Sequence, residues 1–117
     1  MSRVLIVDEQ GDCHLGIAGP LRCQGFEVVS IHSYLVGLQE LQKTGQRFDL
    51  VVLNIAGSPR KGLEWLQQTR AVRFRLGLFP DGVFCVASPF LDPQVELDIE
   101  HEGGRVVYEQ QIRSSAA

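Results

Sequence analysis

Short runs of apolar residues recur along the chain and are rich in β-branched side chains. Four of these runs are prominent and cover residues 4–7, 26–31, 50–53 and 83–87. Three of them are nearly unbroken, which is typical of strands that are covered on both faces of a sheet. A fifth and weaker run covers residues 105–108. The pattern therefore predicts five strands.

The segments between these runs have the length of helices. Ser33 is a suitable N-cap for a helix over residues 34–44, in which leucines recur every three residues, and Gly45 is expected to end it. The segment 61–72 also gathers its apolar residues on one side of a helix. Strands that alternate with helices, about 25 residues apart, predict right-handed βαβ units and a parallel sheet.

Two segments fit this scheme less well. The first helix should occupy residues 12–24, but its helix-breaking residues predict a bent or irregular helix: Gly16, Gly19 and Pro20. Further along, Asp92 followed by Pro93 is a helix start signal, whereas residues 95–100 alternate apolar and acidic side chains as a strand does. Helix and strand both stay open over 92–102, and we favour a short helix.

The whole chain, residues 1–117, suits a single domain. Hydrophobic residues make up 44% and charged residues 21%, which argues against a disordered chain. The apolar runs are far shorter than the roughly 20 residues that cross a bilayer, and the N-terminal run is too short for a secretory signal. The cysteines, Cys13, Cys23 and Cys85, form no CxxC pair, and the histidines form no HxxxH pair. We therefore expect reduced thiols in the core of a cytoplasmic domain, with no zinc site and no membrane contact.

The formal net charge of −3 argues against a nucleic-acid partner, because phosphate contacts need a basic face. The charge is also unevenly distributed. Residues 60–75 hold five basic side chains against one acid, whereas residues 76–104 hold six acids and no Lys or Arg. This bipolarity indicates either two solvated faces or a surface that orients a protein partner.

Polar residues follow the predicted strands at the edge where a parallel sheet forms its ligand crevice. They are Asp8 and Glu9 after the first strand, Asn54 after the third, Ser88 after the fourth and Gln110 after the fifth. Adjacent acids in such a crevice suit a hard divalent cation such as Mg²⁺, which prefers oxygen ligands. This crevice is therefore the candidate functional site.

Five fragments, in order and in register, resemble the receiver domain of bacterial two-component response regulators over nearly the whole chain. They are residues 3–9 with the acidic pair, 25–28, 48–55, Gly62 with Leu63, and Ser88 with Gln110 placed 22 residues later. The resemblance implies an α/β, flavodoxin-like (CheY-like) fold, with a doubly wound five-stranded parallel sheet in the order 2-1-3-4-5. It also implies a signalling protein rather than an enzyme.

The chain departs from this family where the family does its chemistry. Asn54 stands at the position of the phosphoacceptor aspartate, Gln110 at that of the lysine, and Val107 at that of a fifth-strand aromatic residue. An amide is a poor nucleophile and cannot form an acyl phosphate, so the change at Asn54 removes the reaction itself. Together with Ser88, these residues make a degenerate phosphorylation site. The resemblance therefore implies an atypical pseudo-receiver that works without phosphorylation.

The resemblance also implies a weak Mg²⁺ site and no other cofactor. Its ligands would be Asp8, Glu9, the side-chain oxygen of Asn54 and the carbonyl of Ala56, with two negative charges where the family has three. In the alternative interpretation, the two acids are helix N-terminal and turn-forming residues and Ser88 is a turn hydroxyl. Asn54 is then expected to hydrogen-bond to the backbone or to Asp8.

The leading hypothesis is a signalling module that acts through protein–protein contact or dimerisation. In the family, partners commonly bind around the fourth strand, fourth helix and fifth strand, which here carry Phe90, Leu91, Glu96, Asp98 and Glu100. The alternatives are a small flavodoxin-like enzyme or cofactor-binding protein, and a receiver that still binds Mg²⁺ and phosphate weakly. The sequence has no phosphate-binding glycine-rich loop after the first strand, which argues against the enzyme hypothesis.

Only residues 111–117 follow the Gln110 position, where the resemblance implies a fifth helix. In a doubly wound sheet that helix would share a face with the first helix. Its absence would expose apolar side chains of the central strands, for which the sequence suggests Leu5, Val7 and Val51. We therefore expect this face to be covered by a second copy in a homodimer, by a protein partner, or by a helix in sequence not included here.

Overall fold

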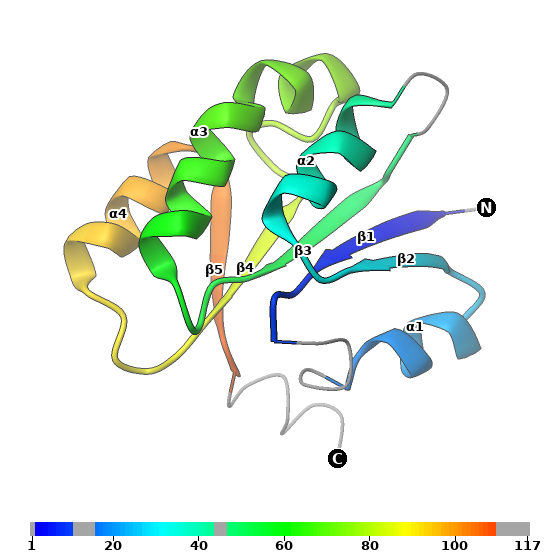
Figure 1. Cartoon of the computed structure of the whole chain (residues 1–117), viewed down its shortest axis with the longest axis horizontal. Helices are drawn as coiled ribbons and strands as arrows, with labels where there is room; N and C mark the ends of the chain where they lie inside the picture. The colour runs from blue at the N-terminus through cyan, green and yellow to red at the C-terminus, as the bar shows by residue number, and fades with distance from the viewer. Residues whose placement is uncertain (1, 11–15, 44–46, 110–117) are drawn as a thin grey trace.

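The computed structural model describes residues 2–10, 16–43 and 47–109. In this part of the chain, five strands form one parallel sheet in the order β2-β1-β3-β4-β5 (Figure 1). The strands are β1 (Arg3–Val7), β2 (Glu27–Ile31), β3 (Leu50–Asn54), β4 (Val83–Ala87) and β5 (Gly104–Tyr108). All five predicted strands are confirmed, with bounds that differ from the prediction by at most one residue, and so is their order.

The described residues also form four helices, and none of them is long and apolar enough to span a membrane. The helices are α1 (Ala18–Cys23), α2 (Tyr34–Gln42), α3 (Pro59–Leu76) and α4 (Pro93–His101). The start of α2 is as predicted, because the Ser33 Oγ accepts a hydrogen bond from the Val36 N–H at 3.3 Å. The helix ends two residues earlier than predicted, and Gly45 lies outside the described residues.

The first helix is shorter than the predicted range of 12–24. Because α1 begins at Ala18, Gly16 precedes it with a φ of 66°, and Pro20 lies in its first turn, where a proline is tolerated. Residues 11–15, the beginning of the predicted helix, lie outside the described residues. Within the described part of the predicted range, Gly16 and Ile17 precede the helix, and the helix ends at Cys23.

Over residues 92–102 the helix prediction is confirmed. The Asp92 Oδ1 accepts a hydrogen bond from the Gln94 N–H at 2.8 Å and so caps α4. Val95 and Ile99, which lie four residues apart, are the buried side chains of this helix. The period-two alternation is overruled because the cap and the i, i+4 pair both favour a helix.

α3 exceeds its predicted range of 61–72 at both ends. Pro59 occupies its first turn, where the missing N–H costs nothing, and Gly77 ends it with a φ of 77°. Its approach to the sheet depends on Gly62, because a Cβ at this position would lie only 2.2 Å from the Ile55 Cγ2 atom. The glycine therefore lets the beginning of α3 pass directly over the end of β3.

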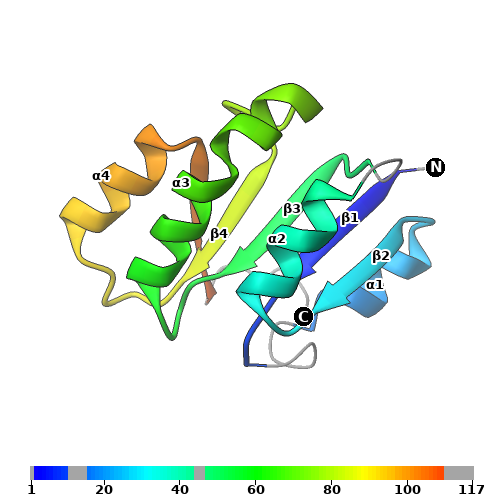
Figure 2. The same ribbon diagram turned by 45° about the horizontal axis from the view of Figure 1, so that its top comes forward.

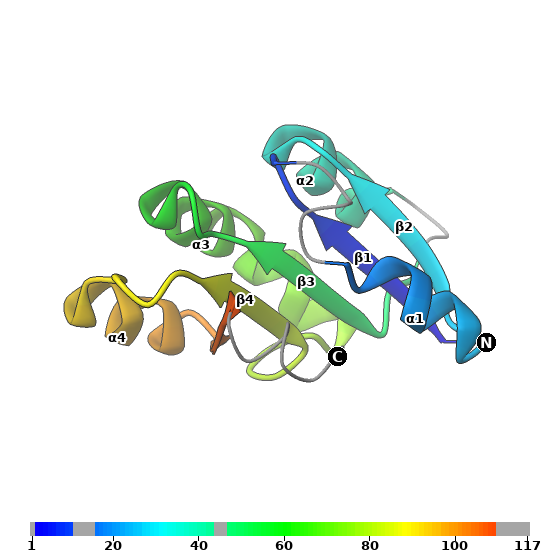
Figure 3. The same ribbon diagram turned by 90° about the horizontal axis from the view of Figure 1, so that it is seen from below.

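Helices α2, α3 and α4 cover one face of the sheet, and α1 lies on the other face (Figures 1 and 3). The larger core lies between the sheet and the three helices, and Leu5, Val7 and Val51 are fully buried in it. The prediction that these three residues line the face of the first helix is therefore wrong. The buried residues of that face are Val4, Ile6, Ala18, Val52 and Val86. A strand that is apolar on both faces carries no sign of which alternate set points to which face.

The predicted core position of the thiols is correct for one cysteine. Cys85 in β4 is buried, and burial raises its pKa to about 12. Cys23, in contrast, is exposed, because it ends the short α1 helix at the surface. Cys13 lies outside the described residues.

Candidate functional site

The site is built where β1 and β3, neighbours in the sheet, reach their carboxyl ends. Val7 pairs with Leu53, so the next residues, Asp8 and Asn54, come out side by side. Both are buried, with exposed fractions of 0% and 3%. The Asn54 Nδ2 donates a hydrogen bond to the Asp8 Oδ1 at 2.9 Å. The predicted contact between Asn54 and Asp8 is confirmed.

The Asn54 amide is held in one orientation by its surroundings. Its Oδ1 accepts the backbone N–H of Ala56 at 3.0 Å, and its Nδ2 also lies 3.4 Å from the Gln10 Oε1. A flipped amide would set its oxygen against the Asp8 carboxylate and its NH₂ against the Ala56 N–H, so both contacts would become repulsive. The side chain therefore presents its NH₂ group to Asp8 and its oxygen to the β3–α3 loop.

The two carboxylate oxygens of Asp8 have different surroundings. Its Oδ1 also accepts the backbone N–H of Gln10 at 2.9 Å, which makes it a turn-forming acid, as one interpretation of the sequence predicts. Its Oδ2 is buried and has no hydrogen-bond partner within the described residues. One oxygen therefore holds the turn after β1, and the other is the unsatisfied atom of the site.

A small polar hollow of about 160 Å³ opens beside the pair and is lined by Glu9, Gln10, Tyr34, Asn54, Gly57 and Ser58. Glu9 is exposed at its rim. A Cβ on Gly57 would lie 2.9 Å from the Gln10 Nε2, so the glycine leaves room for this glutamine side chain. The hollow is therefore narrow and partly filled by the chain's own amides.

Tyr34 links the hollow to Trp65, a connection that sequence reasoning missed. The Tyr34 hydroxyl donates to the backbone carbonyl of Asn54 at 2.6 Å, and the Trp65 Nε1 donates to the Tyr34 carbonyl at 3.0 Å. Burial, with a further contribution from the Glu9 carboxylate, raises the pKa of Tyr34, so its hydroxyl remains a donor. The available signal was its place just after the Ser33 cap, at the same edge of the sheet as Asp8.

Ser88, another residue of the predicted phosphorylation site, does not line this hollow. Ser88 follows β4, and its Oγ accepts the Phe90 N–H at 3.3 Å, so it is the turn hydroxyl that one interpretation predicts. Ser88 lines a neighbouring groove of about 410 Å³ together with Arg60 and Lys61 at the start of α3. Gln110 lies outside the described residues.

Neither a model of a known protein family nor a curated protein matches the sequence. Solved structures do match it. The chemotaxis protein CheY4 of Vibrio cholerae has a TM-score of 0.69 at 18% identity, covering 99% of this chain and 96% of that chain. A response regulator receiver domain protein from Clostridium thermocellum has a TM-score of 0.71 at 16% identity, covering 98% and 94%. The chain has the CheY-like fold.

The CheY-like fold also occurs in a matching structure described as an adenylate cyclase from Rhodopirellula baltica, with a TM-score of 0.71 at 18% identity, covering 97% of this chain and 83% of that chain. At these identities the comparisons establish the fold. The chemistry of the crevice depends on the residues of this chain.

The residues of the predicted partner surface lie together on the β4–α4 loop and on α4 of the CheY-like fold. Phe90 is 92% exposed, and Leu91 beside it is half-buried. The three acids of this surface all belong to α4: Glu96, Asp98 and Glu100. Glu96 accepts a hydrogen bond from the Tyr108 hydroxyl of β5, which ties the helix to the edge strand.

The donor set of the crevice does not fit a resident Mg²⁺ ion. The Asp8 Oδ2 is a suitable free ligand, but the Asn54 oxygen is already bonded to the Ala56 N–H, and the Asn54 NH₂ faces Asp8. The amide hydrogens thus stand against Asp8 where a cation would need oxygen atoms. The part of the chain that the structure describes holds no group of three or more His, Cys, Asp or Glu placed to bind a metal.

Proposed function

We propose that this chain is a phosphorylation-independent, receiver-like signalling module that acts through contact with another protein. The observation that supports this most directly is the Asn54 side chain, which donates to Asp8 at 2.9 Å at the end of β3. Its nitrogen lone pair is delocalised into the amide, so it cannot attack phosphorus as a carboxylate does. The module therefore carries no phosphoryl group on Asn54, which supports action by binding.

The same pair holds the crevice in one arrangement. Two carboxylates at this separation would repel each other and would need a cation or a shared proton between them. The neutral amide of Asn54 donates instead, and a hydrogen bond to a charged acceptor contributes about 1.5–3 kcal/mol. The loops after β1 and β3 are thereby tied together without a phosphoryl group, which suits a module with a constant surface.

The contact surface of the module is the β4–α4 loop with α4. It combines the exposed Phe90 ring and the half-buried Leu91 with the three acids Glu96, Asp98 and Glu100. Aromatic anchors beside charged residues are typical of surfaces that bind proteins. The buried and reduced Cys85 supports a cytoplasmic setting for this contact.

A phosphorylation assay tests the proposal. The purified chain is incubated with Mg²⁺ and acetyl phosphate or phosphoramidate, and its intact mass is measured. We expect no species heavier by about 80 Da, the mass of a phosphoryl group. A stable or acid-labile adduct that maps to Asp8 or to another crevice residue contradicts the proposal.

A further inference from the structure

Helices α2, α3 and α4 form one layer of the molecule (Figure 2). The exposed large apolar side chains among the described residues lie on these helices and on the β4–α4 loop. They are Leu35 and Val36 in α2, Phe74 in α3, Phe90 in the β4–α4 loop and Leu97 in α4. Single exposed apolar residues are ordinary on a surface, so these side chains support an interaction surface only together with the charges around them.

The same layer carries two rows of opposite charge on neighbouring helices. Helix α3 exposes Arg60, Lys61, Arg70 and Arg75, with Glu64 as its only exposed acid. The neighbouring α4 and its cap carry Asp92, Glu96, Asp98 and Glu100, with no Lys or Arg. We call these sets the basic row and the acidic row.

The two rows do not neutralise each other inside the molecule. Among the described residues, the ion pair that connects these helices joins Arg70 to Glu102, just after α4, at 3.6 Å. Arg60, Lys61 and Arg75 make no ion pair with the described acids. Asp92 and Asp98 accept hydrogen bonds from Gln94, and Glu96 accepts one from Tyr108. These donors are neutral, so the negative charge of the acidic row stays uncompensated by them.

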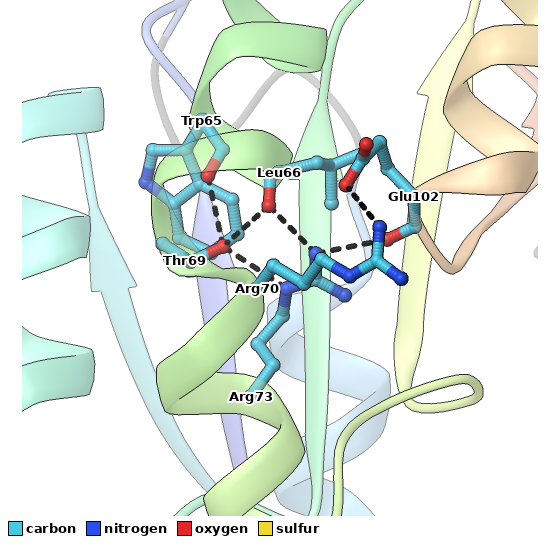
Figure 4. Close-up of polar contacts among 6 residues, drawn as sticks. All are labelled: Trp65, Leu66, Thr69, Arg70, Arg73 and Glu102. Atoms are coloured by element: carbon cyan, nitrogen blue, oxygen red, sulfur yellow. Dashed lines mark hydrogen bonds and ion pairs between the residues drawn. The ribbon is translucent and has the colours of Figure 1, made fainter.

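A buried arginine connects α3 to the residue that follows α4 (Figure 4). Arg73 of α3 is 0% exposed, and its Nη2 donates to the carbonyls of Leu66 at 2.7 Å and of Glu102 at 2.9 Å. Its Nε donates to the Thr69 Oγ1 at 3.0 Å. The guanidinium thus bonds to α3 itself and to the end of α4, so both helices present one rigid surface.

We propose that this surface binds a second copy of the chain, with α4 of each copy lying over α3 of the other. This deepens the proposed function, on which it rests, by naming the partner. α3 and α4 run in the same direction, because each returns the chain to the start of the next parallel strand. A two-fold axis parallel to the helices and between them therefore sets each acidic row against the basic row of the other copy.

The presence of both signs side by side favours a second copy over an unrelated partner. A surface with a single sign of charge cannot pair with itself, but adjacent rows of opposite sign are complementary to their own image under two-fold rotation. Within one chain, the 410 Å³ groove places Asp92 and Val95 at the same level along the helix axis as Arg60 and Lys61. A two-fold axis parallel to the helices keeps that level, so the first turn of α4 in one copy would meet Arg60 and Lys61 of the other copy. Phe90 and Leu97 would supply the apolar contact between the rows.

Sedimentation of the wild-type chain gives the first test. We expect the weight-average mass to rise with concentration from the monomer mass of 13.0 kDa towards twice that value. Raising the salt concentration from about 0.15 M to about 1 M shortens the Debye length from about 8 Å to about 3 Å, so the dimer should weaken about tenfold. This experiment uses only the wild-type chain, so its result does not depend on whether a variant folds.

Two charge-reversed variants give the decisive test. The first, Gln94→Lys with Glu96→Lys, makes the beginning of α4 basic, and the second, Arg60→Glu with Lys61→Glu, makes the beginning of α3 acidic. In a dimer of either variant with itself, side chains of like charge would face each other at both contacts between α3 and α4. Each variant alone should therefore be a monomer. Mixed one to one, they restore opposite charges at both contacts and should form a heterodimer. The control is Arg22→Glu on α1, an exposed charge reversal on the other face of the sheet, which should leave the dimer intact.

Several outcomes would overturn the inference. A wild-type chain that stays monomeric at high concentration has no such dimer, and the proposed function would then rest on a different protein partner. A dimer that survives both double variants and high salt uses another face, such as the face of α1. A phosphoryl adduct in the mass assay would contradict the proposed function while leaving the dimer test valid, so the two failures are distinguishable.

Discussion

At the scale of single residues, Asn54 differs from an aspartate by one NH₂ group in place of one charged oxygen, and this group sets the character of the crevice. The NH₂ donates to Asp8, and the remaining oxygen accepts the Ala56 N–H. Both polar ends of the side chain are therefore satisfied by the chain itself. An aspartate at this position would keep the second bond and replace the first with a repulsion.

This reasoning predicts how Asn54→Asp behaves. We expect the free energy of unfolding at neutral pH to fall by about 1–3 kcal/mol, because two carboxylates then face each other in a buried crevice. The repulsion raises the pKa of the carboxyl pair in the folded state. The loss of stability is therefore absent below the titration of the pair and grows as the pH rises through it.

Mg²⁺ distinguishes the variant from the wild type. The cation should restore the melting temperature of Asn54→Asp and change the Trp65 fluorescence, because Tyr34 connects Trp65 to the crevice. Asn54→Ala serves as the control, since it loses the donor without gaining a charge and should not respond to Mg²⁺. Equal Mg²⁺ responses of the wild type and Asn54→Asp would show that the amide does not block the site.

The two described thiols should differ in reactivity. The thiolate is the reactive form, and Cys85 is buried with a pKa of about 12, so it is protonated at neutral and mildly alkaline pH. Cys23 is exposed. We expect a thiol reagent at about pH 8 to label Cys23 in the folded protein and Cys85 only after unfolding, as measured by peptide mapping. Labelling of both at the same rate would contradict the buried position of Cys85.

At the scale of elements, the sequence predicts well what periodicity and caps decide. The five strands follow from apolar runs, and α2 and α4 begin at the predicted caps, Ser33 and Asp92. Which residues of a strand face which helices is not encoded in an unbroken apolar run, and the assignment of Leu5 and Val7 failed for that reason. Tyr34 was missed because its hydroxyl reaches Asn54 only through the pairing of separate strands.

Alanine substitutions at two glycines in helices should change the free energy of unfolding in opposite directions. Gly62→Ala would place a Cβ 2.2 Å from the Ile55 Cγ2 and push α3 from β3, so we expect a loss of about 1–3 kcal/mol. Gly19 in α1 has open space around its Cβ position, and Gly19→Ala should stabilise the protein by about 0.5–1 kcal/mol. Urea unfolding of both variants measures the difference. Equal effects would mean that helix propensity and not packing governs residue 62.

At the scale of the whole molecule, the arrangement of α3 and α4 depends on Arg73, a residue that the charge pattern predicts to be exposed. Arg73 belongs by sequence to the basic run of residues 60–75, which indicates a solvated face or a surface that orients a protein partner. The structure instead buries Arg73 completely, with its guanidinium 5.7 Å from the centre of the Phe79 ring. Sequence reasoning could not find this, because the carbonyls that accept its hydrogen bonds come from α3 and from the residue after α4.

The last prediction follows from that position. Arg73→Met fills the same space in the core with an apolar side chain. It leaves the Glu102 carbonyl without the hydrogen bond from the Arg73 Nη2. Hydrogen bonds from a charged group contribute about 1.5–3 kcal/mol each, and removing the buried charge offsets part of the loss. We therefore expect the free energy of unfolding to fall by roughly 2 kcal/mol. The amide protons of α4 should lose more protection against exchange than those of β1.

Arg70→Met is the matched control for this prediction. Arg70 lies on the same helix and is exposed, and its ion pair with Glu102 spans 3.6 Å. An exposed pair of this kind contributes at most about 1 kcal/mol, so the control should unfold almost as the wild type does when both are measured at low protein concentration. If Arg70→Met and Arg73→Met lose equal stability, or if exchange in α4 stays unchanged in Arg73→Met, then the buried guanidinium does not hold α4 against α3. The rigid spacing of the two charged rows would then need a different cause.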